Sequence, residues 1–121
     1  MILVSGGWSI VSVELLHTNG TRLCSLPDLP YTRSEHTQTG VTACGGWGDS
    51  AARTTCHTLS STGAWEESHS LDKNRREHCA WRAPQGVMLL GGWDSSSGTT
   101  SEILLENGDT SPSFNLNYQT R

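Results

Sequence analysis

Short apolar stretches, each closely followed by the tripeptide Gly-Gly-Trp, occur three times along this chain. They are Ile2–Val4 before Gly6-Gly7-Trp8, Val41–Cys44 before Gly45-Gly46-Trp47, and Val87–Leu90 before Gly91-Gly92-Trp93. The copies start 39 and 46 residues apart. Apolar runs of this length that end at glycine are typical of short strands. The pattern therefore predicts three equivalent strands in three repeated units.

A second landmark lies downstream of each tripeptide, at Asn19-Gly20, Thr62-Gly63 and Asn107-Gly108. Asn-Gly between two extended runs predicts a β-hairpin with a type I′ turn, in which both central residues have positive φ. The runs before the first and third turns each carry a glutamate, Glu14 or Glu102, followed by apolar residues. Each unit thus continues with two strands joined by a tight turn.

A third landmark is an arginine followed three residues later by histidine, before the second and third apolar runs. These segments are Arg33-Ser-Glu-His36 and Arg75-Arg-Glu-His78. With them, one unit contains four short strands in about 40–50 residues, which is typical of a propeller blade. Helical character is weak throughout, and its one trace, in 65–74, is interrupted by Ser and His. We expect an all-β fold.

The units resemble kelch repeats, which have an Arg-led first strand, a second strand ending in Gly-Gly, a Glu-bearing third strand and a Trp in the fourth. Trp65 is the one Trp at the last of these positions, and Leu16, Leu59 and Leu105 replace the aromatic residue expected before the turn. The resemblance implies kelch-like β-propeller blades of four antiparallel strands. The residues that carry the repeat are Gly6, Gly7, Gly45, Gly46, Gly91, Gly92, Glu14, Glu102, Arg33, His36, Arg75 and His78.

The resemblance covers residues 1–121, with blade remnants at about 1–32, 33–74 and 75–120. Propellers typically close with four to eight blades, and each blade is buried against its neighbours. About two and three-quarter blades make an incomplete ring, which remaining blades or self-association would have to close. We expect a fragment of a longer chain in preference to a self-assembling protomer.

Composition and charge narrow the range of partners. The chain has 121 residues and a formal net charge of −4, with eight Lys and Arg against twelve Asp and Glu. This balance argues against nucleic-acid binding, and no apolar run approaches the roughly 20 residues of a membrane span. An even number of cysteines in a small chain favours an extracellular, oxidising compartment over the cytoplasm. The sequon Asn19-Gly20-Thr21 points the same way, although Asn-Gly also fits a turn.

The four cysteines, Cys24, Cys44, Cys56 and Cys79, allow three disulfide pairings. Cys44 ends a second strand and Cys56 lies in the following third strand, so the two face each other across a hairpin. We favour that pair without excluding the others. Cys-x-x-Cys spacing is lacking, which argues against a zinc knuckle or a redox dithiol.

Motifs for catalysis or cofactor binding are lacking in the sequence. The Gly-Gly pairs are not followed by the helix and Lys-Ser/Thr of a phosphate loop, so we interpret them as backbone with unusual φ that approaches its neighbours closely. Neither a Gly-x-Ser-x-Gly elbow nor a His-Glu-x-x-His helix occurs. We predict no catalytic residue, no metal site and no cofactor.

The repeated tryptophans Trp8, Trp47 and Trp93, with Asp49 and Asp94 close behind, are the candidate binding residues. They either pack between blades or form, on one rim, anchors for a protein or stacking platforms for a sugar. We expect a non-catalytic protein-interaction module that presents the loops 9–12, 48–54 and 94–100.

Two alternatives stay open. One is a secreted lectin-like propeller that binds carbohydrate through the three tryptophans. The other is part of an enzyme similar to galactose oxidase, a resemblance that implies a copper site of Tyr, His and a Tyr–Cys crosslink. Because the chain has only Tyr31 and Tyr118, that site would lie outside it.

Overall fold

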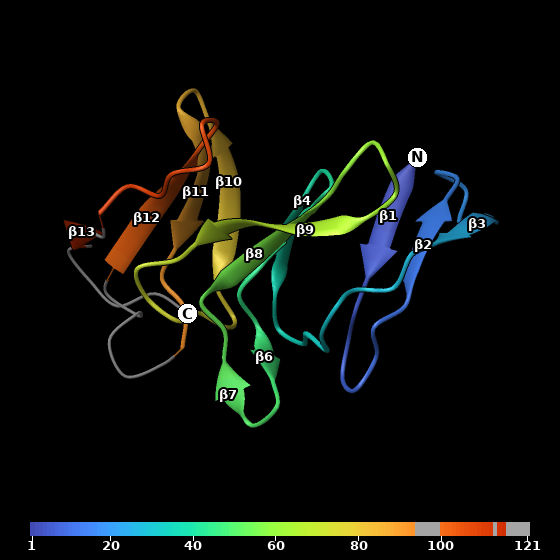
Figure 1. Cartoon of the computed structure of the whole chain (residues 1–121), viewed down its shortest axis with the longest axis horizontal. Helices are drawn as coiled ribbons and strands as arrows, with labels where there is room; N and C mark the ends of the chain where they lie inside the picture. Colours follow the sequence, from blue (N-terminus) through green and yellow to red (C-terminus); the bar gives the residue numbers. More distant parts are fainter. Residues whose placement is uncertain (94–99, 113, 116–121) are drawn as a thin grey trace.

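The computed structural model describes residues 1–93, 100–112 and 114–115, and these contain thirteen strands and no helix. The strands form four antiparallel sheets, none of which closes on itself. Three of the sheets lie side by side (Figure 1). The expectation of an all-β fold is confirmed.

Each of the three larger sheets is built from one stretch of the chain. The first contains β1 (Ile2–Ser5), β2 (Val13–Leu16) and β3 (Arg22–Leu26); the second β4 (Thr37–Thr39), β5 (Thr42–Cys44), β8 (Thr55–Leu59) and β9 (Trp65–Ser70); and the third β10 (Cys79–Ala83), β11 (Gly86–Leu90), β12 (Thr100–Leu105) and β13 (Phe114–Asn115). The fourth sheet is a small ribbon, β6 (Trp47–Gly48) with β7 (Ala51–Ala52), that extends from one end of the second sheet (Figure 1). We call the three larger sheets, with their loops, the first, second and third units.

Apolar side chains are buried between neighbouring units rather than within one of them. Val13 and Leu29 of the first unit pack with Ala43 of the second. A second cluster joins the second unit to the third and contains Cys44, Cys56, Leu71, Leu89 and Leu104. Contact between adjacent sheets therefore supplies the hydrophobic core, as in repeat proteins.

The three hairpin turns share one geometry, and it is not the predicted type I′. The N–H of Gly20 donates to the His17 carbonyl at 2.9 Å, and the His17 N–H donates to the Thr21 carbonyl at 2.8 Å. Gly20 alone has positive φ, while Asn19 does not. A three-residue loop of this kind needs one left-handed residue, which glycine provides. The hydrogen bonds repeat around Gly63 and Gly108.

A connection in which both central residues have positive φ, as a type I′ turn requires, occurs where it was not predicted, between β6 and β7. Asp49 has a φ of 53° and Ser50 a φ of 63°. The turn displays Asp49 at the tip of the ribbon, where it is exposed. The predicted loop 48–54 is therefore largely a β-ribbon.

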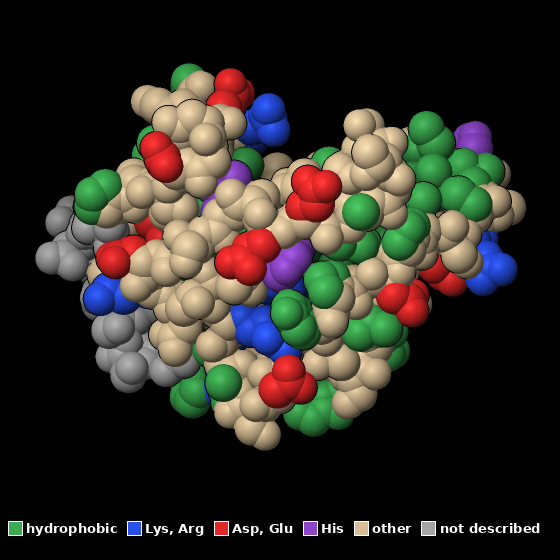
Figure 2. Space-filling model, in the orientation of Figure 1, with side chains coloured by type: hydrophobic (Ala, Val, Ile, Leu, Met, Phe, Trp, Pro, Cys, Tyr) green, Lys and Arg blue, Asp and Glu red, His purple; other side chains and the backbone are tan. Residues whose placement is uncertain are grey.

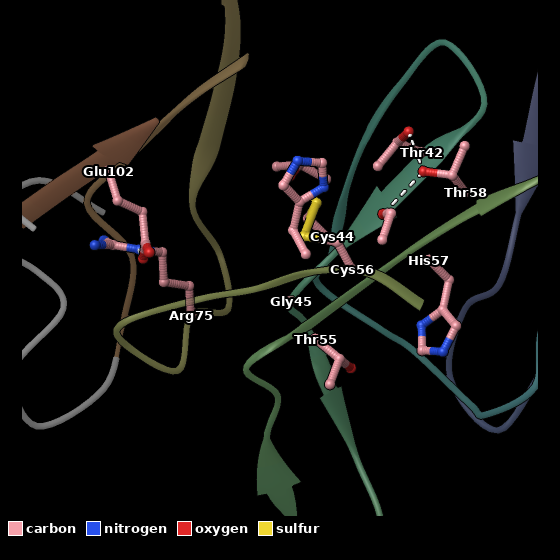
Figure 3. Close-up of a disulfide and its surroundings, with 12 residues drawn as sticks. Thr42, Cys44, Gly45, Thr55, Cys56, His57, Thr58, Arg75 and Glu102 are labelled. Atoms are coloured by element: carbon pink, nitrogen blue, oxygen red, sulfur yellow. Dashed lines mark hydrogen bonds and ion pairs between the residues drawn. A yellow bond between two sulfur atoms is a disulfide. The ribbon is translucent and has the colours of Figure 1, made fainter. Parts of the chain in front are cut away.

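A disulfide joins Cys44 and Cys56, which lie directly opposite each other on β5 and β8 (Figure 3). This is the pair that the sequence favoured, while Cys24 and Cys79 are free and exposed. Both bonded cysteines are buried in the cluster between the second and third units. The covalent bond therefore strengthens the middle of the three units.

The outer edge of the first sheet is open. Among the described residues, β1 pairs only with β2, whereas β5 and β11 each lie between two strands. Ile2, Val4 and Leu23 are close to half exposed in this sheet. Figure 2 shows hydrophobic side chains gathered over the same end of the molecule. The first unit thus has an open edge at β1 and exposed apolar side chains on β1 and β3.

We expect reduction of the disulfide to lower the free energy of unfolding by about 3 kcal/mol, the chain-entropy value for a loop of roughly 13 residues. Urea unfolding with and without a thiol reductant measures the change. A variant with Cys24→Ser and Cys79→Ser keeps the bond and is the matched control. Equal stability of its oxidised and reduced forms would contradict the prediction.

Candidate functional site

The three Gly-Gly-Trp segments come directly after β1, β5 and β11, at one end of the molecule (Figure 1), and we call this end the rim. The Gly7 N–H donates to the Arg33 carbonyl at 2.9 Å. One unit further, the Gly46 N–H donates to the Arg75 carbonyl at 2.7 Å. The first and second Gly-Gly pairs are thereby each hydrogen-bonded to the segment that opens the next unit.

The side chains of Arg33 and Arg75 are completely buried and bind equivalent groups in their own units. Arg33 Nη1 donates to the carbonyls of Gly45 and Thr55, at 2.7 and 2.8 Å. Arg75 Nη1 donates to the carbonyls of Gly91 and Thr100, at 2.6 and 2.9 Å. In both units the second nitrogen, Nη2, bonds to the hydroxyl of the same threonine.

The two buried arginines differ in the group that faces them on the third strand of the unit. Arg75 forms an ion pair with Glu102, Nε to Oε1 at 2.6 Å, and both side chains are fully buried (Figure 3). Arg33 faces His57 instead, and Nη2 donates to the ring Nδ1 at 2.6 Å. The Nε of Arg33 has no hydrogen-bond partner in the part of the chain that is described.

The environment of Arg33 disfavours positive charge. Burial, reinforced by the nearby charge of Arg53, lowers the pKa of Arg33 to about 10. Burial and then Arg33 itself lower the pKa of His57. His57 must be neutral to accept a hydrogen bond at Nδ1, so acid conditions place two positive charges side by side in this unit.

His36 and His78 lie against the first glycine of the preceding Gly-Gly pair. A Cβ on Gly45, whose φ is +64°, would lie 2.6 Å from the Arg75 carbonyl oxygen and 2.8 Å from Cε1 of His78. Glycine is therefore required there by both space and conformation. The His78 Nε2 hydrogen-bonds with the hydroxyl of Thr37 at 2.8 Å. Burial, then Arg75 and His36, lower the pKa of His78 to about 3.

Two of the rim tryptophans enclose an arginine. The guanidinium of Arg76 lies 4.4 Å from the ring centre of Trp47 and 4.0 Å from that of Trp93. Its Nη1 also lies 3.3 Å from a carboxylate oxygen of Glu35. Cation–π contacts on both sides hold this side chain across the boundary between the second and third units.

The first and second tryptophans have a hollow between them instead. Trp8 is 72% exposed, and Ser34 occupies the place that Arg76 has in the third unit. The hollow has a volume of about 320 Å³ and is lined by Trp8, Ser9, Thr32, Ser34, Trp47, Asp49 and Ser50. That volume is at the lower end of the roughly 300–1,000 Å³ of small-ligand pockets.

The structure brings together some of the candidate residues and separates others. Trp8, Trp47 and Asp49 line one hollow, in which Asp49 is paired with Arg53 at 2.7 Å. Asp94 and loop residues 94–99 lie outside the described residues. Glu14 pairs with an exposed Arg22 and contacts no buried arginine, unlike its counterpart Glu102.

Sequence reasoning missed Arg76 and His57. Arg76 stands next to the repeat arginine, and its contrast with Ser34 in the unit before was the available signal. His57 takes the third-strand place that Glu14 and Glu102 hold in the other units. An alignment of the three strands shows that substitution, but only the structure reveals that a buried arginine faces it.

The described residues contain neither a group of three or more His, Cys, Asp or Glu placed to hold a metal ion nor a helix long and apolar enough to cross a membrane. A second cavity, of about 110 Å³, lies between the second and third sheets and is lined mainly by strand residues such as Thr42, Val87 and Leu104.

No protein-family model matches the chain, and no curated protein does.

Acid is expected to destabilise the fold because of His78. Its pKa is lower in the folded chain than in the unfolded chain, so unfolding takes up a proton as the pH falls from 6.5 towards 3. At pH 5 this amounts to about 2 kcal/mol from His78 alone. Urea unfolding at pH 7 and pH 5 measures the loss, which His78→Gln reduces and the exposed control His17→Gln leaves in place. Equal stability at the two pH values would refute the prediction.

Exchanging the groups that face the two buried arginines is expected to have opposite effects. Glu102→His gives the third unit the residue that faces the arginine in the second. It lowers the free energy of unfolding by about 3–5 kcal/mol, since the buried Arg75 loses its carboxylate partner. His57→Glu copies the third unit into the second and raises that free energy by roughly 1–3 kcal/mol. Urea unfolding of both variants at pH 7 tests this pair of predictions, and a loss of stability in both would contradict it.

Proposed function

We propose that this chain is a non-catalytic protein-interaction module built from kelch-like β-propeller blades, with the rim as its binding surface. The observation that carries the proposal is the pair of exposed rim tryptophans, Trp8 at 72% and Trp93 at 43%. Large aromatic side chains held at a surface are the residues that most often dominate protein–protein interfaces.

The repeated bonding of the units supports kelch-like blades. The same bonds repeat along the chain: a Gly-Gly N–H donates to the Arg carbonyl of the next unit, and that Arg side chain donates to a Gly and a Thr of its own unit. A further blade, supplied by the same polypeptide or by another copy, would pack against the exposed apolar side chains of the first sheet. The rim would then be one sector of a larger ring.

The firm backbone beneath the rim supports a role in binding. The tryptophans follow segments fixed by buried arginines, so an interface there is formed with little loss of conformational freedom. The ribbon β6–β7 projects Asp49 beside them. The disulfide Cys44–Cys56 supports an extracellular setting, since such bonds persist in oxidising compartments.

Carbohydrate binding is a second candidate, favoured by the hydroxyl groups in the hollow. Ser9, Thr32, Ser34 and Ser50 line it together with Trp8. An aromatic face with several hydroxyls suits a sugar ring as well as a peptide.

Selection from a random peptide display library against the immobilised oxidised chain tests the proposed function. We expect selected peptides to lose at least tenfold in affinity on Trp8→Ala, because the anchor is removed. The matched control is Trp81→Ala, which removes a tryptophan that is 61% exposed on β10. A lack of enriched peptides, or binding that depends on Trp81, would contradict the proposal, and a glycan array with the same variants tests the carbohydrate candidate.

A further inference from the structure

Successive tryptophans along the rim form two slots. The backbone around the two slots is hydrogen-bonded in the same way, but only one slot is filled by a side chain. The slot between Trp47 and Trp93 is filled by Arg76, whereas the slot between Trp8 and Trp47 is the hollow of about 320 Å³. The filled slot, one unit away, therefore shows that an arginine side chain fits between two of the rim tryptophans.

Equivalent backbone bonds support the comparison. In the third unit, the Trp93 N–H donates to the Arg76 carbonyl at 2.8 Å. In the second unit, the Trp47 N–H donates to the Ser34 carbonyl at 2.7 Å, and the Ser34 N–H donates back at 2.9 Å. Arg76 and Ser34 each directly follow a buried repeat arginine, so they begin from the same place. A serine side chain is too short to fill the space that an arginine fills.

A carboxylate lies beside each of the two slots. Glu35 accompanies the guanidinium in the filled slot, at 3.3 Å. Asp49 lines the open slot, and its side chain is 77% exposed. Arg53 pairs with one oxygen of Asp49 but is held outside the hollow, where it donates to the Thr32 carbonyl at 3.2 Å and lies over the ring of Tyr31. The net charge of −4 adds a general attraction for cations.

We propose that the slot between Trp8 and Trp47 binds the guanidinium of an arginine side chain supplied by a protein partner. A planar guanidinium stacks between two indole rings and reaches a carboxylate at the edge, which a lysine ammonium does less well. This inference rests on the proposed function in taking the rim as the surface that meets the partner. It adds the chemical identity of the group that is recognised.

The first test uses Nα-acetyl-arginine methylamide as the probe and NMR of the tryptophan indole N–H groups as the readout. We expect saturable shifts of the Trp8 and Trp47 signals with a dissociation constant in the millimolar range. Nα-acetyl-citrulline methylamide has the same shape without the charge and is expected to bind at least tenfold more weakly. Equal shifts with citrulline, or no shift up to about 50 mM arginine probe, would overturn the inference.

The second test fills the slot with a side chain of the protein itself. Ser34→Arg copies Arg76 into the second unit and is expected to abolish probe binding while shifting the Trp8 signal towards its ligand-bound position. Ser34→Gln is the neutral control and is expected to keep binding within about threefold of the parent. Unchanged probe binding by Ser34→Arg would place the probe elsewhere and overturn the inference, as would displacement of the probe by a neutral sugar.

The outcomes for this inference and for the proposed function are separable. If peptides selected on the rim depend on Trp8 but carry no arginine, the interaction module stands and the guanidinium site fails. If the arginine probe binds between the tryptophans but no peptide is enriched, the slot's affinity for a guanidinium stands, while the interaction module and a protein partner as the source of that group both fail.

Discussion

Two guanidinium groups buried without access to water are the constraint on which the arrangement of the units depends. A charge in such a place is costly unless its hydrogen-bond donors are satisfied. Arg33 and Arg75 both reduce this cost by binding the carbonyls that flank the loop after the Gly-Gly strand, although the Nε of Arg33 has no partner among the described residues. Their own carbonyls accept N–H groups from the preceding unit. One residue thus fixes both the loop of its own sheet and the position of the sheet before it.

The repeat was readable from the sequence because its landmarks are local. Gly-Gly and Arg-x-x-His are short motifs that recur, with the hairpin glycines, in the same order along the chain, and each glycine landmark reflects a local backbone requirement. The turn type was not readable, because Asn-Gly serves both a two-residue and a three-residue loop, and strand register decides between them. The two hairpin glycines at Gly20 and Gly108 therefore predicted where the chain turns but not how.

The partners of the charged side chains could not be predicted from the sequence, for a different reason. Glu14 and Glu102 look alike in sequence, yet Glu102 is fully buried against Arg75 and Glu14 is partly exposed. Whether a buried arginine reaches the glutamate depends on a segment about 27 residues away in the chain. The contacts of Arg76 with Trp47 and Trp93 also cross between units, and no spacing rule predicts them.

Trp47 belongs to both slots at once. Its indole contacts Arg76 at the boundary with the third unit and lines the hollow at the boundary with the first. Whatever occupies the hollow and favours one orientation of this ring changes the free energy of the Arg76 contact, and the dependence is reciprocal. Because both contacts involve one side chain, binding in the hollow and the stability of the boundary between the second and third units are thermodynamically linked.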